Sequence, residues 1–298
     1  MYDVHRLRLL RELSHRGTLA AVAEALGYRP SSVSHQLATL EREVGARLLE
    51  PAGRGVRLTA IARVLVAHTE AILRELEEAQ AAVAAADSEL LGAVRLATFQ
   101  TAAHRLLPGV LTRLAAQHPR LGLTVAHVRA EQALPELLAR DVDVVLSERY
   151  RGQVPPLPPG VVRAVSAPDA MLLATPASWG RVSLRDLAHA PWALEPEGTA
   201  ARAWATALCR AAGFEPRVIV ESTDVYLHER LVADGLAAAF LPRLAGLACP
   251  RAETGGVASA PTGEHRIIDV YLRSGSQSAP AIAAVRDALA EALSALSG

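Results

Sequence analysis

TLAAVAEALGYRPSSVSHQLATLEREV, residues 18–44, decides the fold of the first part of this chain. Apolar residues recur at helical spacing on both sides of Gly27, and Pro30 opens the second segment, where a first-turn proline is tolerated. The sequence therefore predicts two short helices joined by a tight turn, which is how a protein places a helix in a DNA groove. The apolar positions are Leu19, Val22, Ala23 and Leu26 in the first helix, and Val33, Leu37, Leu40 and Val44 in the second.

The second predicted helix carries hydrogen-bonding side chains on the face opposite to its apolar one. Such side chains can donate to phosphate oxygens or to base edges. A solvated helix face explains any single one of them equally well, but the whole set on one face favours DNA contact, and His35 fits a DNA donor better than a metal ligand. With the arginines of the hairpin described next, the expected DNA-binding residues are Arg29, Ser31, Ser32, Ser34, His35, Gln36, Thr39, Arg42, Arg54 and Arg57.

The segments on either side complete a winged helix. Residues 3–16 place apolar side chains along one helical stripe, and residues 47–59 combine a proline and two glycines with an alternating Arg-Leu run, which is typical of a hairpin. Arg54 lies between the two glycines at the expected hairpin tip, where it is free to enter the DNA backbone or minor groove. One weak point is Arg29, a poor N-cap residue, for which Ser31 or Ser32 could compensate.

Residues 60–87 contain no Gly or Pro and are rich in Ala, Leu, Glu and Arg, so they predict one long helix. Packing of this helix on its own domain is one explanation of its apolar stripe. No neighbouring segment offers itself as a partner, however, so pairing with a second copy in a dimer is the better account. The predicted seam is near-heptad, with one slip, and consists of Ile61, Leu65, His68, Ile72, Leu76, Ala79 and Val83.

Beyond Gly92 the pattern changes to alternating strands and helices, which predicts a mainly parallel sheet with flanking helices. A proline-rich crossing at residues 154–161 separates two similar α/β units, and the last strand, RIIDVYLR (266–273), and the final helix (279–296) could return to the first unit. The expected division is a winged helix at 1–58, a dimerisation helix at 59–90 and a two-lobed domain at 91–298. Its lobe I would hold about 91–162 and 275–298, and its lobe II about 163–274.

The composition restricts the chemistry. The formal charge of the chain is zero, so basic surface has to be local, and residues 1–58 supply it with nine Arg against six acidic residues. All 31 basic residues are Arg, which excludes a Schiff-base lysine and a phosphate-loop lysine. Cys209 and Cys249 form neither a CxxC motif nor a disulfide framework. No secretory signal or apolar run of about 18 residues appears, so a cytoplasmic, nucleoid-associated protein without a membrane partner is expected.

With these parts in place, the chain resembles the LysR-type transcriptional regulators along essentially its whole length. The resemblance rests on residues 20–59, which are specific in combination, and on four individually weaker segments: LLPGVLTRLAAQHPRL (106–121), DVDVVL (141–146), AGFEPRV (212–218) and VADGLAAAFLP (232–242). It implies a periplasmic-binding-protein-like effector domain in the second half of the chain. It also implies a homodimer or homotetramer that binds double-stranded operator DNA with an inverted repeat, under the control of a small-molecule effector.

An effector site is expected where four helices begin at the ends of strands, near Thr101, Gln132, Thr199 and Asp224. Their N-termini would converge on the crevice between the lobes, where free N–H groups and helix dipoles suit a small anionic metabolite. Each residue alone is also explained as an ordinary helix cap. The expected effector-binding residues are Thr98, Phe99, Gln100, Thr101, Thr199, Ser222 and Thr223. The loop after the first strand of this domain departs from the family's pattern of small hydroxyl residues at Phe99 and Gln100.

Two other classes of protein compete with this interpretation. An α/β enzyme would be compatible with the fold, but the sequence contains no GxSxG, HExxH, dinucleotide GxGxxG or metal-spaced Cys/His cluster. A small-molecule-binding protein without a regulatory role would be expected to carry a secretion signal and would leave the DNA-binding unit without a purpose. We therefore expect a regulator that is not an enzyme and has no cofactor, no catalytic residues and no metal site.

Overall fold

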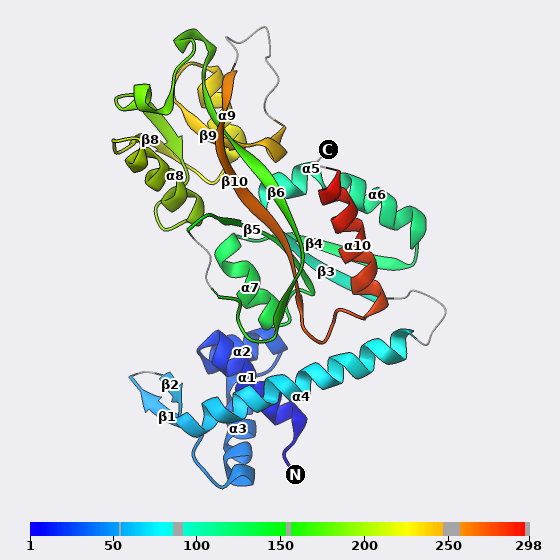
Figure 1. The fold of residues 1–298 in the computed structure, drawn as a ribbon. Coiled ribbons are helices and arrows are strands. Elements are labelled where there is room, and N and C mark those ends of the chain that lie inside the picture. The colour runs from blue at the N-terminus through cyan, green and yellow to red at the C-terminus, as the bar shows by residue number, and fades with distance from the viewer. Residues whose placement is uncertain (54, 86–91, 153–155, 247–256, 296–298) are drawn as a thin grey trace.

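A computed structural model describes residues 1–53, 55–85, 92–152, 156–246 and 257–295 (Figure 1). The first part is a winged helix in which three helices pack on a two-stranded hairpin. Asp3 and Thr18 cap the first two helices with their side chains, and Gly17 and Gly27 end them in the left-handed conformation that glycine adopts without strain. The elements are α1 (Val4–Arg16), α2 (Leu19–Leu26), α3 (Pro30–Val44), β1 (Leu49–Ala52) and β2 (Gly55–Leu58).

The apolar stripes predicted for this segment form its core. Val22, Val33, Leu37 and Leu40 are buried together with the leucines of α1. The prediction of two helices around Gly27 is therefore confirmed. The hairpin follows in the expected place, with β1 and β2 antiparallel.

A long helix, α4 (Ala60–Ala85), crosses the molecule beneath the second part of the chain (Figure 1). Its first turns pack on α1. The helix confirms the prediction from the absence of Gly and Pro, and residues 86 and 87 of the predicted helix lie outside the described residues.

The second part is built on a six-stranded sheet in the order β4-β3-β5-β10-β6-β9. Two of its strands, β6 and β10, are long, antiparallel partners that run through both lobes (Figure 1). The last strand and last helix do return to lobe I, since β10 pairs with β5 and α10 packs on α6. The strands are β3 (Gly92–Thr98), β4 (Leu121–His127), β5 (Val144–Tyr150), β6 (Val161–Pro176), β9 (Ala239–Pro242) and β10 (Val257–Arg273).

Helices cover both faces of this sheet. On β5, Val144 and Leu146 face one apolar core and Val145 faces another, as the alternation of side chains along a strand requires. Lobe II has its own core around the fully buried Trp192, beside a small sheet of β7 (Pro191–Leu194) and β8 (Arg217–Glu221). The helices are α5 (Gln100–Arg105), α6 (Leu107–Gln117), α7 (Ala130–Leu138), α8 (Ala200–Ala211), α9 (Val225–Ala233) and α10 (Pro280–Ser294).

From the sequence pattern we also expect one helix at residues 101–119, two strands at 161–167 and 170–176, and a helix that begins at Leu184, and all three predictions are wrong. The helix expected from residue 101 to 119 is broken at Leu106 into α5 and α6, because Pro108 starts a new helix better than it continues one. Residues 161–167 and 170–176 form the single strand β6 despite Pro168, since its register along β10 continues through that residue. The helix expected from Leu184 is only a 3-10 turn that ends at Leu187.

The winged helix contacts lobe I through charged side chains. Arg11 of α1 is almost fully buried and donates to the carbonyl oxygen of Leu138, while Arg16 binds the Asp141 carboxylate at 2.8 Å. On α4, Glu77 forms ion pairs with Arg140 and with Arg273. The C-terminal end of α7 and the residues that follow it are therefore attached to the winged helix.

Candidate functional site

The start of α3 is the most open part of the predicted DNA surface. Arg29 occupies its N-cap position without any side-chain hydrogen bond to the helix, and no partner of the Arg29 guanidinium is found within the described residues. Ser31 and Ser32 are exposed and do not replace the missing cap. Pro30 has no N–H, and the N–H groups of Ser32 and Val33 donate to the Arg29 carbonyl, so the Ser31 N–H remains for an anion from outside.

The remaining residues predicted on α3 divide into free and engaged ones. Ser34 and His35 are exposed, whereas Gln36 is half-buried and accepts a hydrogen bond from Arg6 Nε at 2.9 Å. Thr39 is also engaged, since its hydroxyl donates to the carbonyl of His35 and accepts from Arg42 at 2.7 Å. The free donors therefore lie in the first half of the helix, at the end that enters a groove in helix-turn-helix proteins.

The wing contributes one described arginine to this surface. Arg57 is exposed but pairs with Glu50 across the hairpin at 2.8 Å. Arg54, predicted at the hairpin tip, lies outside the described residues. The exposed aromatic ring of Tyr28, next to Arg29, is a residue that the polar pattern did not single out.

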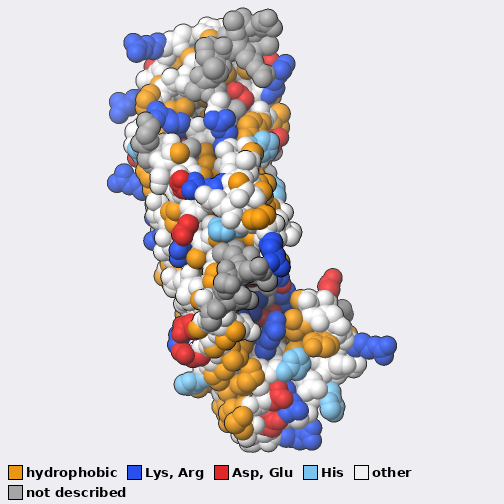
Figure 2. Space-filling model, turned by 90° about the vertical axis from the view of Figure 1, so that its right-hand side faces the viewer, with side chains coloured by type: hydrophobic (Ala, Val, Ile, Leu, Met, Phe, Trp, Pro, Cys, Tyr) orange, Lys and Arg blue, Asp and Glu red, His pale blue; other side chains and the backbone are white. Residues whose placement is uncertain are grey.

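Large apolar side chains remain exposed along α4. Figure 2 shows hydrophobic side chains gathered on the lower part of the molecule, where α4 lies. The residues are not quite those of the predicted seam, because Leu65 is half-buried against the winged helix and Val64 is exposed in its place. The exposed set is Ile61, Val64, Ile72, Leu76 and Val83.

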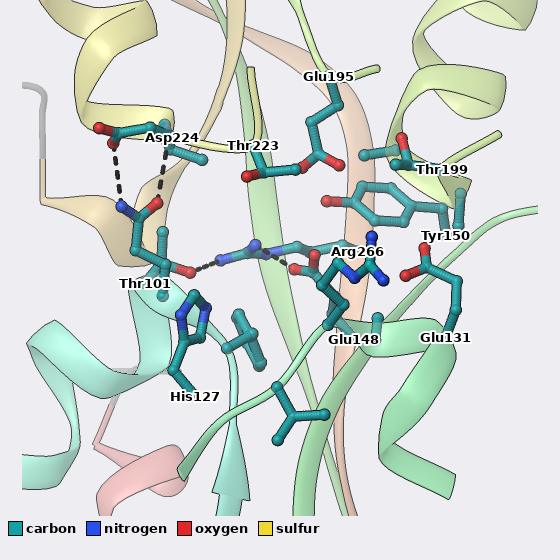
Figure 3. Close-up of a pocket in the computed structure, with 18 residues that line it drawn as sticks. Thr101, His127, Glu131, Glu148, Tyr150, Glu195, Thr199, Thr223, Asp224 and Arg266 are labelled. Carbon is teal, nitrogen blue, oxygen red and sulfur yellow. Dashed lines mark hydrogen bonds and ion pairs between the residues drawn. The ribbon is translucent and has the colours of Figure 1, made fainter. Parts of the chain in front are cut away.

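A cavity of about 140 Å³ lies where the two lobes meet. Four helices begin at its wall, as expected: α5 and α7 from lobe I, and α8 and α9 from lobe II. Figure 3 shows that side chains from these helix starts and from the strands between them converge on this space. The site is therefore assembled from at least six segments that are distant in the sequence.

Arg266 of β10 lies at the centre of the cavity wall, with only 2% of its surface exposed (Figure 3). Its guanidinium donates to Asp169 at 2.8 Å, to Thr101 Oγ1 at 2.7 Å and to Glu148. It also lies 5.2 Å from the ring centre of Phe99. Burial alone would lower the pKa of Arg266, but the nearby Glu148, Tyr150 and Asp169 outweigh that effect and keep it charged.

One residue bridges the two lobes across this cavity. The amide of Gln100, at the start of α5, donates to Asp224 Oδ1 at 3.0 Å and accepts from the backbone N–H of Val225 at 3.2 Å (Figure 3). Asp224 also caps α9 by accepting from the N–H groups of Tyr226 and Leu227. The positive end of α9 is thus already occupied by a carboxylate of the chain itself.

Glu195, at the end of β7, is the most perturbed acid of the cavity. Burial raises the pKa of its carboxyl to about 7, and the Glu148 carboxylate contributes to the rise. Tyr150 lies beside both, and burial raises the pKa of its phenol, so it stays protonated. Near neutral pH, Glu195 is therefore close to half ionised.

Five of the seven predicted effector residues line the cavity: Phe99, Gln100, Thr101, Thr199 and Thr223. The other two do not. Thr98, the last residue of β3, is buried and its hydroxyl has no partner among the described residues, and the Ser222 hydroxyl accepts from the Asp224 N–H and shapes the turn before α9. Both stand one residue before a lining residue, so the error is one of position along the turn.

Sequence reasoning missed most of the charged lining. The missed residues are His127, Arg129, Glu131, Glu148, Tyr150, Glu195, Asp224 and Arg266. One signal was available, since Glu148 and Arg266 are charged residues that adjoin the apolar runs VVL (144–146) and II (267–268). Their charges, which include four carboxylates and two guanidinium groups, do not favour the anionic ligand expected from helix N-termini.

The described part of the chain holds neither a clustered metal site nor a helix that could span a membrane. No group of three or more His, Cys, Asp or Glu residues is placed there to hold a metal ion. None of the described helices is both long and apolar enough to cross a membrane.

Comparison with known protein families gives two matches that together span most of the chain. Residues 4–63 match the family described as bacterial regulatory helix-turn-helix protein, lysR family. Residues 87–294 match the family described as LysR substrate binding domain. The first match covers α1 to the start of α4, and the second covers both lobes and the cavity between them.

Individual relatives agree with these matches. The transcriptional dual regulator GltC of Bacillus subtilis is 25% identical over 245 residues, which cover 80% of each chain. A probable hydrogen peroxide-inducible genes activator of Mycobacterium xenopi is 36% identical over 140 residues, covering 47% of this chain and 74% of that protein.

Solved structures show the same fold. A full-length OxyR variant from Pseudomonas aeruginosa superposes with a TM-score of 0.68 at 19% identity and covers 97% of this chain and 95% of its own. Full-length CbnR in complex with its target DNA superposes with a TM-score of 0.54 at 22% identity, over 98% and 100% of the two chains.

Proposed function

The chain belongs to the LysR family of transcriptional regulators, and from this premise we propose a separate role for each of its two sites. The start and exposed face of α3 bind operator DNA, and the cavity between the lobes binds a small-molecule effector that changes how the DNA is held. The observation that supports this most is the pairing of an uncapped, solvent-exposed helix start with a preformed cavity in one chain.

At the DNA, we assign two roles to the predicted residues. Arg29 and the Ser31 N–H at the start of α3 contact phosphate, which positions the helix without reading sequence. The side chains of Ser32 and His35 are exposed and have no partners in the described part of the chain, so they are the candidates for contact with base edges. Gln36 serves mainly to hold Arg6.

The exposed ridge of α4 is proposed to pair with α4 of a second copy. A monomer would leave five large apolar side chains of one helix in water. A pair of winged helices related by a two-fold axis would then read an inverted repeat.

This pairing is testable with one substitution. Leu76→Glu places a charge in the ridge and should shift the protein toward monomer in sedimentation velocity. Ile219→Glu is the matched control, because Ile219 on β8 is 47% exposed and Leu76 is 44% exposed. Equal dimer content in both variants would contradict pairing through α4.

Helix α7 offers a route from the cavity to the DNA. Its first residues, Ala130 and Glu131, line the cavity, and at its other end the Leu138 carbonyl accepts from Arg11 of the winged helix. A nine-residue helix is only about 14 Å long and moves as a rigid rod. Ligand-induced closure of the lobes would therefore displace α1 directly.

Thiol-based peroxide sensing, the activity suggested by the names of some relatives, is not what the described residues support. Cys209 is buried in the core of lobe II, and burial raises the pKa of its thiol to about 12. A thiol that is protonated and buried reacts slowly with peroxide. Cys249 lies outside the described residues.

The finer assignments go with this proposal. We include in it the division of the chain at residues 58 and 90. We also include a cytoplasmic, nucleoid-associated location and the absence of enzymatic activity, which suit a DNA-bound regulator. Two carboxylates of the cavity are engaged by the chain itself, since Glu148 pairs with Arg266 and Asp224 accepts from Gln100.

DNA binding is tested by a gel shift with the DNA upstream of the chain's own gene and a random fragment of equal length. Wild type should prefer the upstream fragment. A Ser32→Ala/His35→Ala variant should lose that preference and keep binding to random DNA, whereas Ser178→Ala, an exposed site in lobe II, should behave as wild type. Unchanged preference in the double variant would remove α3 as the reading helix.

A further inference from the structure

Behind the interlobe cavity lies a small inner chamber of about 30 Å³. Tyr150, Glu195, Val225 and Arg266 line both spaces, so the chamber is a continuation of the cavity into lobe II. Its inner wall includes the imidazole of His228 on α9. A space of this size takes one water molecule or one small group of a larger ligand.

His228 is the unusual member of that wall. Only 3% of its surface is exposed, and its Nε2 atom has no hydrogen-bond partner in the described part of the chain. Burial lowers the pKa of His228, against the opposing influence of a backbone hydrogen bond at Ser222 and of Asp224, so the imidazole is neutral near pH 7. A neutral imidazole has one acceptor nitrogen. When Nδ1 carries the proton and donates a hydrogen bond to the Ser222 backbone, Nε2 is a hydrogen-bond acceptor that a ligand can satisfy.

The charged groups of the cavity lining also favour a ligand that donates hydrogen bonds. Its lining holds four carboxylates, Glu131, Glu148, Glu195 and Asp224, against the guanidinium groups of Arg129 and Arg266. Arg266 is already shared between Glu148 and Asp169, the latter a fifth carboxylate behind the wall. Arg129 is exposed at the mouth rather than in the chamber.

An anion in the chamber would therefore meet Glu195 and find no uncommitted cation. A cation would meet Glu195, an acceptor nitrogen and aromatic rings. Tyr150 and Trp204 pack with ring centres 5.6 Å apart, and Trp204 and Phe240 with centres 5.1 Å apart, all on the chamber wall. Aromatic faces attract cations.

We propose that the effector carries a protonated primary amine, and that this ammonium group occupies the inner chamber between Glu195 and His228. The inference rests on the proposed function of the cavity as the effector site. The ammonium has three N–H donors, enough for the Glu195 carboxylate, His228 Nε2 and the Tyr150 hydroxyl. The rest of the effector lies in the larger cavity toward Thr199 and Gln100.

Such a ligand makes binding depend on pH in a defined direction. Glu195 has a pKa of about 7, and an ammonium ion favours its ionised form. The charged or titratable groups around it are Glu148 and Tyr150 on β5, Glu131 on α7, His228 on α9 and Arg266 on β10. The ionised fraction of Glu195 rises about tenfold from pH 6 to pH 8, and amine affinity should rise with it.

The experiment uses the full chain and three probes of one carbon skeleton: n-butylamine, butanoate and butan-1-ol. Thermal shifts are measured as a function of probe concentration at pH 6 and pH 8, where the amine stays protonated. n-Butylamine should stabilise the protein, with an apparent affinity about tenfold higher at pH 8. Butanoate and butan-1-ol should have little effect.

Two variants locate the site. Glu195→Gln should lower the affinity for n-butylamine at pH 8 by about tenfold or more, and the affinity should no longer depend on pH. Glu197→Gln removes the same charge two residues away, where the side chain is exposed and outside the cavity lining, and should leave binding unchanged. His228→Gln should weaken the amine at both pH values alike.

Several results would overturn the inference: stabilisation by butanoate in place of the amine, amine binding that does not change with pH, or no shift with any probe, as a chamber holding water only would give. The gel shift with upstream DNA separates this inference from the proposed function. A positive gel shift with a failed amine series would leave a DNA-binding regulator with a different effector. A failed gel shift would remove the regulator itself.

Discussion

The start of α3 and the wall of the interlobe cavity use similar polar residues in opposite ways. At α3 the helix begins without a side-chain cap, and the side chains of Arg29, Ser32 and His35 are exposed and have no partners in the described part of the chain. In the cavity, α5 and α7 also begin without a side-chain cap, but Thr199 caps α8, Asp224 caps α9 and the Arg266 guanidinium is bonded to Asp169 and Thr101. An open set of donors fits a long polyanion, whereas a closed network fits one small molecule of defined shape.

The first prediction concerns Arg266, which is the centre of the hydrogen-bond network in the cavity wall. Arg266→Met leaves Asp169 and Glu148 as buried carboxylates without their partner, and this should cost about 3–5 kcal/mol of unfolding free energy. Urea denaturation measures the loss. Arg151→Met removes an exposed arginine that is 3.5 Å from Glu264 and should cost less than about 1 kcal/mol. Equal losses would show that the network is not a structural centre.

The second prediction concerns the perturbed acid of the same wall. Because the pKa of Glu195 is higher in the folded chain than in the unfolded one, ionising it opposes folding, and the penalty grows as pH rises from about 4.5 to 7. Glu195→Gln should therefore stabilise the protein at pH 8 by about 1–3 kcal/mol and give little gain below pH 5. Urea melts at the two pH values check this, and a gain that is the same at both would refute the assigned pKa.

The third prediction gives the start of α3 a side-chain cap like those of α8 and α9. Arg29→Ser supplies the missing N-cap and should raise the unfolding free energy by about 1 kcal/mol. The same change removes a phosphate contact, so the affinity for operator and for random DNA should fall alike. The slope of the log binding constant against log salt concentration should become shallower by about 1. Arg29→Gln separates the effects, because it removes the charge without adding a cap. Unchanged DNA affinity in both variants would show that Arg29 does not contact phosphate.

The contrast also explains what could be predicted from the sequence. The winged helix is made of consecutive segments whose periodicity fixes which residues are buried, so Val33, Leu37 and His35 could be placed from spacing alone. The helix starts at the cavity were predictable in the same way, and they supplied Gln100, Thr101 and Thr199.

The cavity wall could not be predicted, because its charges come from strands that pair over long sequence distances. Glu148 and Arg266 meet only because β5 and β10 lie side by side in antiparallel register, and Glu195 approaches them from a separate sheet. The periodicity within a single strand does not show that these three side chains come together. The sign of the ligand charge was therefore expected from helix dipoles alone, without the carboxylates that outweigh them.

The central claim is that one chain holds a DNA site on α3 and a separate small-molecule site between its lobes. Amide hydrogen exchange on the full-length protein tests it directly, first with upstream DNA and then with n-butylamine at pH 8. We predict that DNA slows exchange in residues 29–44 and that the amine slows it at residues 195–201 and 223–228. Protection of the cavity segments by DNA alone, or no protection of α3 by DNA, would contradict the account.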